Sequence, residues 1–233
     1  MTIPRRFVLA TTNPGKIREI QSILEGVPLE LVGLEELAPV PSPEETGRTF
    51  AENARLKALY YARATGLPAI AEDSGLEVDA LGGIPGVQSA RFCGEDATYP
   101  ERFAALYRML DEAGRVREEK VGRVPRHECI RGPAETPAGR TRGPAATTAS
   151  PARFVCHIAV ANDDAILFEA RGTVEGHIAP EPRGDRGFGY DPIFFHPPSG
   201  RTLAEVSDER KREVSHRGEA FRQLRAWVER DGR

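Results

Sequence analysis

The feature that most restricts the fold is a short apolar run followed at once by a polar loop. The run Phe7–Ala10 contains no polar residue, so it predicts a strand buried on both faces. Thr11–Lys16 then indicates a loop, and Ile17, Ile20 and Leu24 mark one face of a helix. Such a loop can offer backbone N–H groups, hydroxyls and a lysine to phosphate oxygens. It lacks the Walker A spacing, and an ordinary βα loop is the alternative.

Two acidic residues follow a second apolar run. Leu67–Ile70 predicts another buried strand, and we expect the polar segment Glu72–Gly75 to leave the end of that strand. An acidic pair at a strand end can supply oxygen ligands to a hard cation. A free carboxylate beside the metal, such as that of Asp73, can also take a proton from water. An ordinary acidic turn is the alternative that this segment alone leaves open.

A helix is predicted where Thr49–Glu52 matches a capping box. Glu44 and Glu45 lie just before it, so a second carboxylate for a metal could come from there. The alternative is that their charges only complement the helix dipole. Asn53 and Lys57 are four residues apart on this helix and share a face, which points either at a ligand or at water.

The C-terminal half carries strands first and then four candidate site residues, Phe188, Lys211, His216 and Arg217. Phe154–Val160 and Ala165–Ala170 predict two antiparallel strands joined by a turn. Glycines flank Phe188, which favours an exposed ring able to stack on a base, although such a turn can also pack its aromatics inward. Lys211 stands out in a charged helical turn. His216–Arg217 at a helix start could give a fork of donors to a ligand oxygen.

Large apolar residues nearly disappear between about Gly114 and Pro151, where Arg, Pro, Gly, Ala and Thr dominate. Such a composition cannot bury enough surface to offset the entropy of ordering the chain. We therefore expect one domain that spans residues 1–233 and carries a disordered, low-complexity insertion at about 114–151. Its basic residues could contact nucleic acid, but a solvated linker is the better interpretation.

Composition argues against several classes of function. The formal net charge of -3 does not suit a general nucleic-acid binder, which carries a basic excess. No apolar run reaches the length of about 18 residues that a bilayer-spanning helix needs. Cys93, Cys129 and Cys156 are scattered and odd in number, which suits a reduced cytoplasmic protein better than a disulfide scaffold.

Each of these signals is weak, but their order is informative. The motifs are Thr11–Lys16, Glu44–Gly47, Glu52–Ala54, Glu72–Leu76, Phe188–Pro192 and Ser215–Arg217. In this order and at these separations the chain resembles the noncanonical purine nucleoside triphosphate pyrophosphatases, the Ham1-like family of inosine/xanthosine triphosphate diphosphatases. The likeness covers the chain except about 114–151, where we expect a shorter link in the family.

The resemblance implies an α/β fold with a long, twisted, mixed central sheet flanked by helices. It implies two lobes with a nucleotide cleft between them. The implied activity is Mg²⁺-dependent hydrolysis of ITP, dITP and XTP to the monophosphate and pyrophosphate, which cleanses the nucleotide pool. The implied state is a cytoplasmic homodimer that acts on a small-molecule purine nucleoside triphosphate, with no membrane and no nucleic acid as a partner.

The resemblance also assigns roles to residues. Asp73 is the implied catalytic base and a Mg²⁺ ligand, together with Glu44. Glu45 is the alternative ligand, because the register of the motif does not decide between the two, and Lys57 is a further candidate for the phosphates. The implied substrate-binding residues are Thr11, Thr12, Asn13, Pro14, Gly15, Lys16, Ser74, Phe188, Gly189, Tyr190, Asp191, Lys211, His216 and Arg217.

Substrate choice would follow from hydrogen bonding. Inosine and xanthine carry an oxygen at purine position 6, which donors of His216 and Arg217 can bond, whereas adenine would set donor against donor. Guanine shares that oxygen, so its 2-amino group must be rejected separately, and Phe188 would stack on the ring. Two alternatives stay open: a pyrophosphatase for pyrimidine or modified-base triphosphates, and a nucleotide- or RNA-binding module without catalysis.

Overall fold

The computed structural model describes residues 5–121 and 150–231. Within these ranges the strands form one open sheet of seven, in the order β2-β1-β3-β4-β5-β6-β7. The strands are β1 (Arg6–Leu9), β2 (Glu30–Gly33), β3 (Ala69–Val78), β4 (Pro151–Asn162), β5 (Ala165–Ile178), β6 (Phe194–His196) and β7 (Arg201–Thr202). β1 pairs in parallel with β2 and β3, and the other neighbouring pairs are antiparallel. The predicted α/β fold with a mixed sheet is confirmed.

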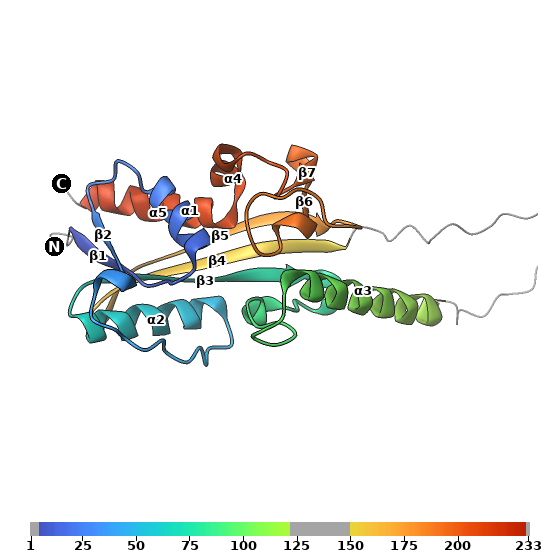
Figure 1. The fold of residues 1–233 in the computed structure, drawn as a ribbon, viewed down its shortest axis with the longest axis horizontal. Helices are drawn as coiled ribbons and strands as arrows, with labels where there is room; N and C mark the ends of the chain where they lie inside the picture. Colours follow the sequence, from blue (N-terminus) through green and yellow to red (C-terminus); the bar gives the residue numbers. More distant parts are fainter. Residues whose placement is uncertain (1–4, 122–149, 232–233) are drawn as a thin grey trace, which may run out of the picture.

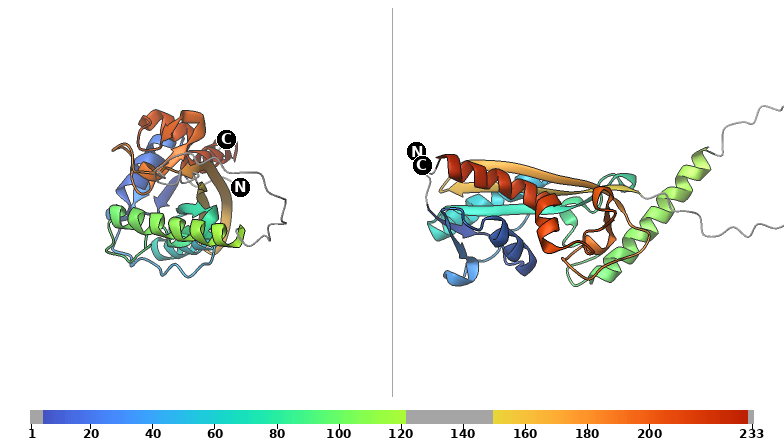
Figure 2. Two further views of the ribbon diagram at one scale, coloured as in Figure 1. Left: turned by 90° about the vertical axis from the view of Figure 1, so that its right-hand side faces the viewer. Right: turned by 90° about the horizontal axis from the view of Figure 1, so that it is seen from above.

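Five α-helices of the described residues accompany this sheet. They are α1 (Pro14–Ile23), α2 (Phe50–Thr65), α3 (Tyr99–Val121), α4 (Asp208–Val214) and α5 (His216–Asp231). Figure 1 shows α1 and α5 on one face of the sheet and α2 on the opposite face, at the end where β1 and β2 lie. α3, β6 and β7 lie at the other end. In Figure 2 the C-terminal end of α5 lies at the same end of the molecule as β1.

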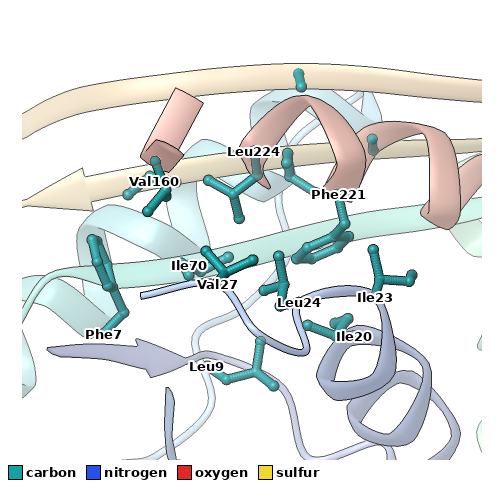
Figure 3. Packing of buried hydrophobic residues seen from close by; sticks show 14 of the residues in the cluster. Phe7, Leu9, Ile20, Ile23, Leu24, Val27, Ile70, Val160, Phe221 and Leu224 are labelled. Carbon is teal, nitrogen blue, oxygen red and sulfur yellow. The ribbon is translucent and has the colours of Figure 1, made fainter. Parts of the chain in front are cut away.

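Apolar side chains form a separate core at each end of the molecule. At the β1 end, Phe221 and Leu224 of α5 pack with Ile20 of α1 and Ile70 of β3 (Figure 3). A second cluster lies under α2 on the opposite face of the sheet. A third cluster surrounds Leu76 at the other end of β3. These two ends correspond to the two predicted lobes, and β3, β4 and β5 run through both (Figure 1).

Local sequence signals fix where the first two helices begin. The Asn13 side-chain oxygen accepts the backbone N–H groups of Gly15 at 2.9 Å and Lys16 at 3.1 Å, which caps α1. Pro14 suits the first position of the helix, where its missing N–H has no intrahelical acceptor. At α2, Thr49–Glu52 forms the predicted capping box. The two helices therefore begin at defined positions beside the sheet.

The prediction that the strand ends before Glu72–Gly75 is wrong. β3 does not stop at Ile70 but continues to Val78, and it pairs with β4 from Ala69 onward. β4 supplies backbone partners over this whole length, and the acidic side chains are neutralised by cations from other elements. Acidic residues indicate a turn only when nothing in the fold can pair with them.

The expected start of the insertion at Gly114 is also wrong. α3 continues to Val121, because the Arg, Glu and Lys residues that follow Gly114 favour helix. At the other boundary Pro151 already belongs to β4. The remainder of the predicted insertion, residues 122–149 with Cys129, lies outside the described residues. Within the described ranges no helix is both long and apolar enough to cross a membrane.

Candidate active site

The candidate site lies along the edge of β3, at the point where β1 stops. β1 pairs with β3 through Ile70, and the Ala10 N–H donates to the Ile70 carbonyl at 2.8 Å. Beyond this point the chain enters the loop that leads to α1. Because side chains alternate along a strand, Glu72 faces α1 and α5 while Asp73 faces α2. Two groups of charged side chains therefore approach the same edge.

The first group, here called the charge chain, alternates in sign along one line of contacts. Its members are Asp191, Lys211, Glu19, Arg217, Glu72 and Lys16. Each is 2.5 to 3.1 Å from the next, and together they join the loop after β5, α4, α1, α5 and β3. Buried charges of this kind persist because each has an opposite partner.

Glu72 lies near the middle of the charge chain and is almost completely buried. It accepts two hydrogen bonds from Arg217, at 3.1 and 3.2 Å, and pairs with Lys16 at 2.9 Å. Burial opposes its ionisation, but the charges of Arg217 and Lys16 hold the pKa of Glu72 well below its usual range. Burial and Glu72 raise the pKa of Cys156, whose protonated thiol donates to Glu72 at 3.0 Å.

The second group, here called the Asp73 group, lies on the α2 side. The Lys57 ammonium contacts Asp73 at 3.2 Å and Glu45 at 2.7 Å. The Asn53 side-chain amide donates to the other Asp73 oxygen at 3.1 Å, and Arg91 donates to the other Glu45 oxygen at 2.7 Å. The group therefore joins α2, β3 and two loops through a pair of carboxylates and a pair of cations.

The protonation of the two carboxylates in the Asp73 group differs. Burial raises the pKa of Asp73, and Lys57 offsets part of that rise. Burial also opposes ionisation of Glu45, but Lys57 and Arg91 hold the pKa of Glu45 below its usual range. Lys16 also lowers the pKa of Asp73, so the charge chain and the Asp73 group are near enough to interact.

The Phe188 ring packs against the loop at the start of α1. The glycines on either side of Phe188 have positive φ, 72° and 68°. A Cβ atom on Gly15 would lie 2.7 Å from the Phe188 ring, so the ring rests directly on the start of α1. Lys211 lies 4.5 Å and Arg217 5.5 Å from the ring centroid. The ring is half-buried rather than freely exposed.

Two residues that follow Phe188, Tyr190 and Asp191, make different contacts. The Asp191 carboxylate accepts the Phe188 N–H at 2.8 Å and pairs with Lys211, so it holds the turn against the charge chain. Tyr190 is buried against Tyr99, and its hydroxyl donates to the Ser89 carbonyl at 3.0 Å. Tyr190 therefore packs inward, and its role in substrate binding stays a prediction.

Two further candidates, Ser74 of β3 and His216 of α5, lie beside Arg217. Ser74 accepts a hydrogen bond from Arg217 at 3.0 Å. His216 stacks on Phe154 with ring centroids 4.9 Å apart, and among the described residues its buried Nδ1 has no hydrogen-bond partner. Burial and the charge of Arg217 lower the pKa of His216 well below its usual range, so the ring is neutral at neutral pH.

The two candidate metal carboxylates differ in their surroundings. Glu45 belongs to the Asp73 group, whereas the Glu44 side chain is exposed. The role of Glu44 as a metal ligand stays a prediction, and the geometry favours the alternative, Glu45. The reason is that chain direction before α2, which the motif does not contain, sets which of two adjacent carboxylates turns inward. Thr12 is exposed and Thr11 half-buried in the loop before α1.

The residues present fit a Mg²⁺ ion. Among the described residues no three His, Cys, Asp or Glu side chains lie close enough to hold a metal by themselves. Mg²⁺, however, binds in many sites through one or two carboxylates, with waters and phosphate oxygens completing the shell. Asp73 and Glu45 already share one cation, the Lys57 ammonium, at 3.2 and 2.7 Å. They therefore form a carboxylate pair that substrate phosphate could complete.

Sequence reasoning missed two members of these groups, Glu19 and Arg91. Glu19 follows Lys16 by three residues on α1, and this spacing was a usable signal because it places both on one helix face. Arg91 stands in an irregular segment without apolar periodicity, so no pattern pointed to it. A pocket of about 180 Å³ opens between α1, Phe188 and α4, and Glu19 and Lys211 are among its lining residues.

An open mixed sheet, a capped loop at the start of α1 and two groups of ion-paired side chains at the β3 edge define an α/β protein with one charged candidate site. The chain belongs to the Ham1 family, whose model matches residues 7–125 and 138–227. The resemblance found in the motifs is therefore confirmed. Residues 126–137 lie outside the two matched segments.

Relatives and solved structures agree with this assignment. The dITP/XTP pyrophosphatase of Shigella flexneri is 43% identical over 224 residues, which cover 94% of this chain and 96% of that protein. A Ham1 protein from Coxiella burnetii is 36% identical, with a TM-score of 0.77 over 99% of this chain and 100% of that one. The Ham1 protein of Staphylococcus aureus is 35% identical, with a TM-score of 0.74 over 97% and 99%.

Proposed function

We propose that this protein acts in the cytoplasm and hydrolyses the noncanonical purine nucleoside triphosphates ITP, dITP and XTP to the monophosphate and pyrophosphate. The names of its relatives support this substrate class. The observation that carries the proposal is the arrangement at the β3 edge, where Asp73 and Glu72 hold cations of α1, α2 and α5 on opposite faces of one strand. Such an arrangement can bind a phosphate chain and activate water beside it.

The charge balance of the site supports a requirement for Mg²⁺. The ion pairs join five carboxylates, Glu19, Glu45, Glu72, Asp73 and Asp191, to five cations, Lys16, Lys57, Arg91, Lys211 and Arg217. Five minus five leaves no surplus charge for a triphosphate, which carries about four negative charges at neutral pH. Asp73 and Glu45 would hold Mg²⁺. When bound, it would supply positive charge and polarise the phosphoryl oxygens.

Asp73 is the residue suited to take a proton from water. Lys57 and Asn53 each hold one of its oxygens, at 3.2 and 3.1 Å, which fixes the plane of the carboxylate. Burial raises its pKa, which makes it a stronger base than an exposed aspartate. Water deprotonated there would attack the α-phosphorus, with pyrophosphate as the leaving group. Lys16 and the Thr11–Asn13 loop would hold the phosphate chain.

Arg217 and His216 are the donors suited to a purine 6-oxygen. Glu19, Glu72 and Ser74 hold the Arg217 guanidinium in one orientation. His216 is fixed by its stack on Phe154 and can donate from one ring nitrogen in its neutral form. An adenine amino group would leave these donors unpaired, which disfavours ATP. Phe188 would stack on the base, with Asp191 and Lys211 holding its turn.

The decisive assay measures pyrophosphate and phosphate separately, from ITP, dITP and XTP beside ATP and GTP, with and without Mg²⁺. We expect Mg²⁺-dependent release of pyrophosphate from the first three. Asp73→Asn should lower kcat by about 100-fold or more while the protein stays folded. Release of phosphate, or equal turnover of ATP, would reject the function. Near-normal turnover of Asp73→Asn would reject the base.

We also propose a homodimer formed through the outer face of α2. An open hollow of about 590 Å³ lies there, lined by Leu56, Leu59, Tyr60, Arg63 and Ala64. Apolar side chains on an outer helix face favour contact with another protein surface. Light scattering should show a dimer for the wild type and a monomer for Leu59→Glu; a wild-type monomer would overturn this part of the proposal.

A further inference from the structure

Arg91 is held near Asp73 by a rigid segment. The Ser89 hydroxyl accepts the Leu76 N–H at 2.9 Å and donates to the Gly86 carbonyl at 2.6 Å. A Cβ atom on Gly75 would come within 2.3 Å of the Ser89 hydroxyl, so this segment rests directly on β3. Its backbone position beside Ser74 and Asp73 is therefore fixed by the sheet, and Arg91 follows two residues later.

The guanidinium of Arg91 is only partly used in this structure. It donates one hydrogen bond, to Glu45 at 2.7 Å, out of the five N–H donors of an arginine. Its side chain is 34% exposed, so a ligand in the site can reach it. Glu45 is meanwhile contacted by two cations, because its other oxygen accepts from Lys57 at 2.7 Å. Glu45 would therefore keep a cationic partner, Lys57, if Arg91 turned to a ligand.

A metal ion bound by Asp73 and Glu45 would compete with Lys57 and Arg91 for the same oxygens. In the Asp73 group two carboxylates balance two cations, so a divalent ion there leaves the charges of Lys57 and Arg91 uncompensated. A phosphate chain can provide that compensation. The planar fork of an arginine matches two phosphate oxygens better than a lysine ammonium does.

We propose that Arg91 is a substrate-binding residue for the pyrophosphate portion of the triphosphate. It leaves Glu45 for the terminal phosphate oxygens when Glu45 and Asp73 hold the metal. Arg91 is paired with Glu45 in the Asp73 group, whereas Phe188 lies against Lys211 and Arg217 of the charge chain. The proposal therefore puts the phosphate end of the nucleotide at the Asp73 group and its base near Phe188. The proposal rests on the proposed function, because it needs a triphosphate with its base near Phe188.

Calorimetry with inorganic pyrophosphate and with inosine monophosphate tests this role without turnover. In Mg²⁺, Arg91→Met should weaken pyrophosphate binding by about tenfold or more and leave inosine monophosphate binding unchanged. Arg91→Lys should show a smaller loss of pyrophosphate affinity. In chelator the Arg91→Met variant and the wild type should differ little. Arg153→Met is the matched control, because Arg153 is similarly exposed and ion-paired to Glu77 and Asp79.

The outcomes are separable. Wild-type pyrophosphate affinity in Arg91→Met, or an equal loss for inosine monophosphate, would overturn the role of Arg91. A loss as large in chelator as in Mg²⁺ would overturn the exchange from Glu45. If Arg91→Met does not fold, as thermal unfolding would show, Arg91→Lys decides by its pyrophosphate affinity relative to Arg153→Met. Failure of the wild type to release pyrophosphate from any purine triphosphate would instead reject the proposed function.

Discussion

At the scale of single residues, carboxylates rather than solvent set the orientation of Arg217. Its guanidinium makes four hydrogen bonds, two to Glu72 and one each to Glu19 and Ser74. Four of its five N–H donors are therefore in use, which leaves one for a ligand. A donor held this rigidly cannot turn away from a wrong base, so it discriminates strongly between an oxygen and an amino group.

Replacing Arg217 by alanine should therefore narrow the preference for ITP over ATP. The ratio of kcat/KM for the two substrates should fall by about tenfold or more, because the donor aimed at the 6-oxygen is lost. The variant will also lose stability, since Glu72 keeps its burial but loses a partner. The substrate ratio is independent of how much protein is folded. An unchanged ratio would remove Arg217 from the account of specificity.

Glu19 predicts how stability depends on pH. Burial opposes its ionisation, but Arg217 and Lys211 outweigh this effect and hold the pKa of Glu19 below its usual range. A carboxylate with a depressed pKa stabilises the fold above its unfolded pKa, and this contribution is lost as the pH falls through the folded pKa. Glu19→Gln should therefore cost about 3 kcal/mol at neutral pH and less in acid.

Denaturant unfolding at pH 7 and in acid measures this difference for Glu19→Gln against the wild type. Glu229→Gln is the control, because Glu229 forms an exposed pair with Arg225 and should change little at either pH. An equal cost of Glu19→Gln at both pH values would contradict the linkage. On acidification, the free energy of unfolding should fall more for the wild type than for Glu19→Gln.

Residues of the site differed in how far the sequence could identify them. Lys16, Asp73 and Phe188 stand in motifs, and the structure brings all three to the β3 edge or the adjacent loop. Arg91 could not be found, because its position depends on a segment folded back onto β3. The choice of Glu45 over Glu44 likewise needs the path of the chain, since neighbouring residues of one type look equivalent in sequence.

At the scale of elements, the first turn of α1 has two roles. It starts the helix, and it forms the surface on which the Phe188 ring lies. Gly15 lies inside the helix, where a glycine weakens helix formation, yet the Phe188 ring occupies the space of its missing side chain. Glycine at this position therefore lowers the stability of the helix, but it leaves room for the Phe188 ring to lie on the loop. β3 is a similar case, because acidic residues that disfavour a strand are kept by tertiary ion pairs.

Gly15→Ala should separate helix stability from function. Alanine favours helix over glycine by about 1 kcal/mol, but its Cβ would displace the Phe188 ring. We expect a raised KM for ITP without a matching loss of thermal stability. Gly114→Ala is the control, because α3 leaves open space around that position and alanine should stabilise it without changing KM. An unchanged KM for ITP in Gly15→Ala would contradict the packing of Phe188 on the loop.

At the scale of the whole molecule, three long strands join two separate cores, and the charged groups lie between them. The alternation of apolar and polar segments was enough to predict helices around a sheet. The extent of β3 was not predictable, because its partner β4 lies more than 70 residues away in the chain. Long-range pairing of this kind leaves no local signal, and it is what brings α1, α2 and α5 to one edge.

The final prediction concerns residues 126–137, which lie outside both segments matched by the family model. Every residue proposed here for binding or catalysis lies in 5–121 or 150–231, so deletion of 126–137 should leave kcat/KM for ITP within about twofold of the wild type. Deletion of 100–111, an equal length of α3 that carries core residues Phe103, Leu106 and Leu110, should abolish folding. Parallel ITP assays and thermal unfolding compare the two deletions. A tenfold loss of activity from the first deletion would show that this segment contributes to the active enzyme.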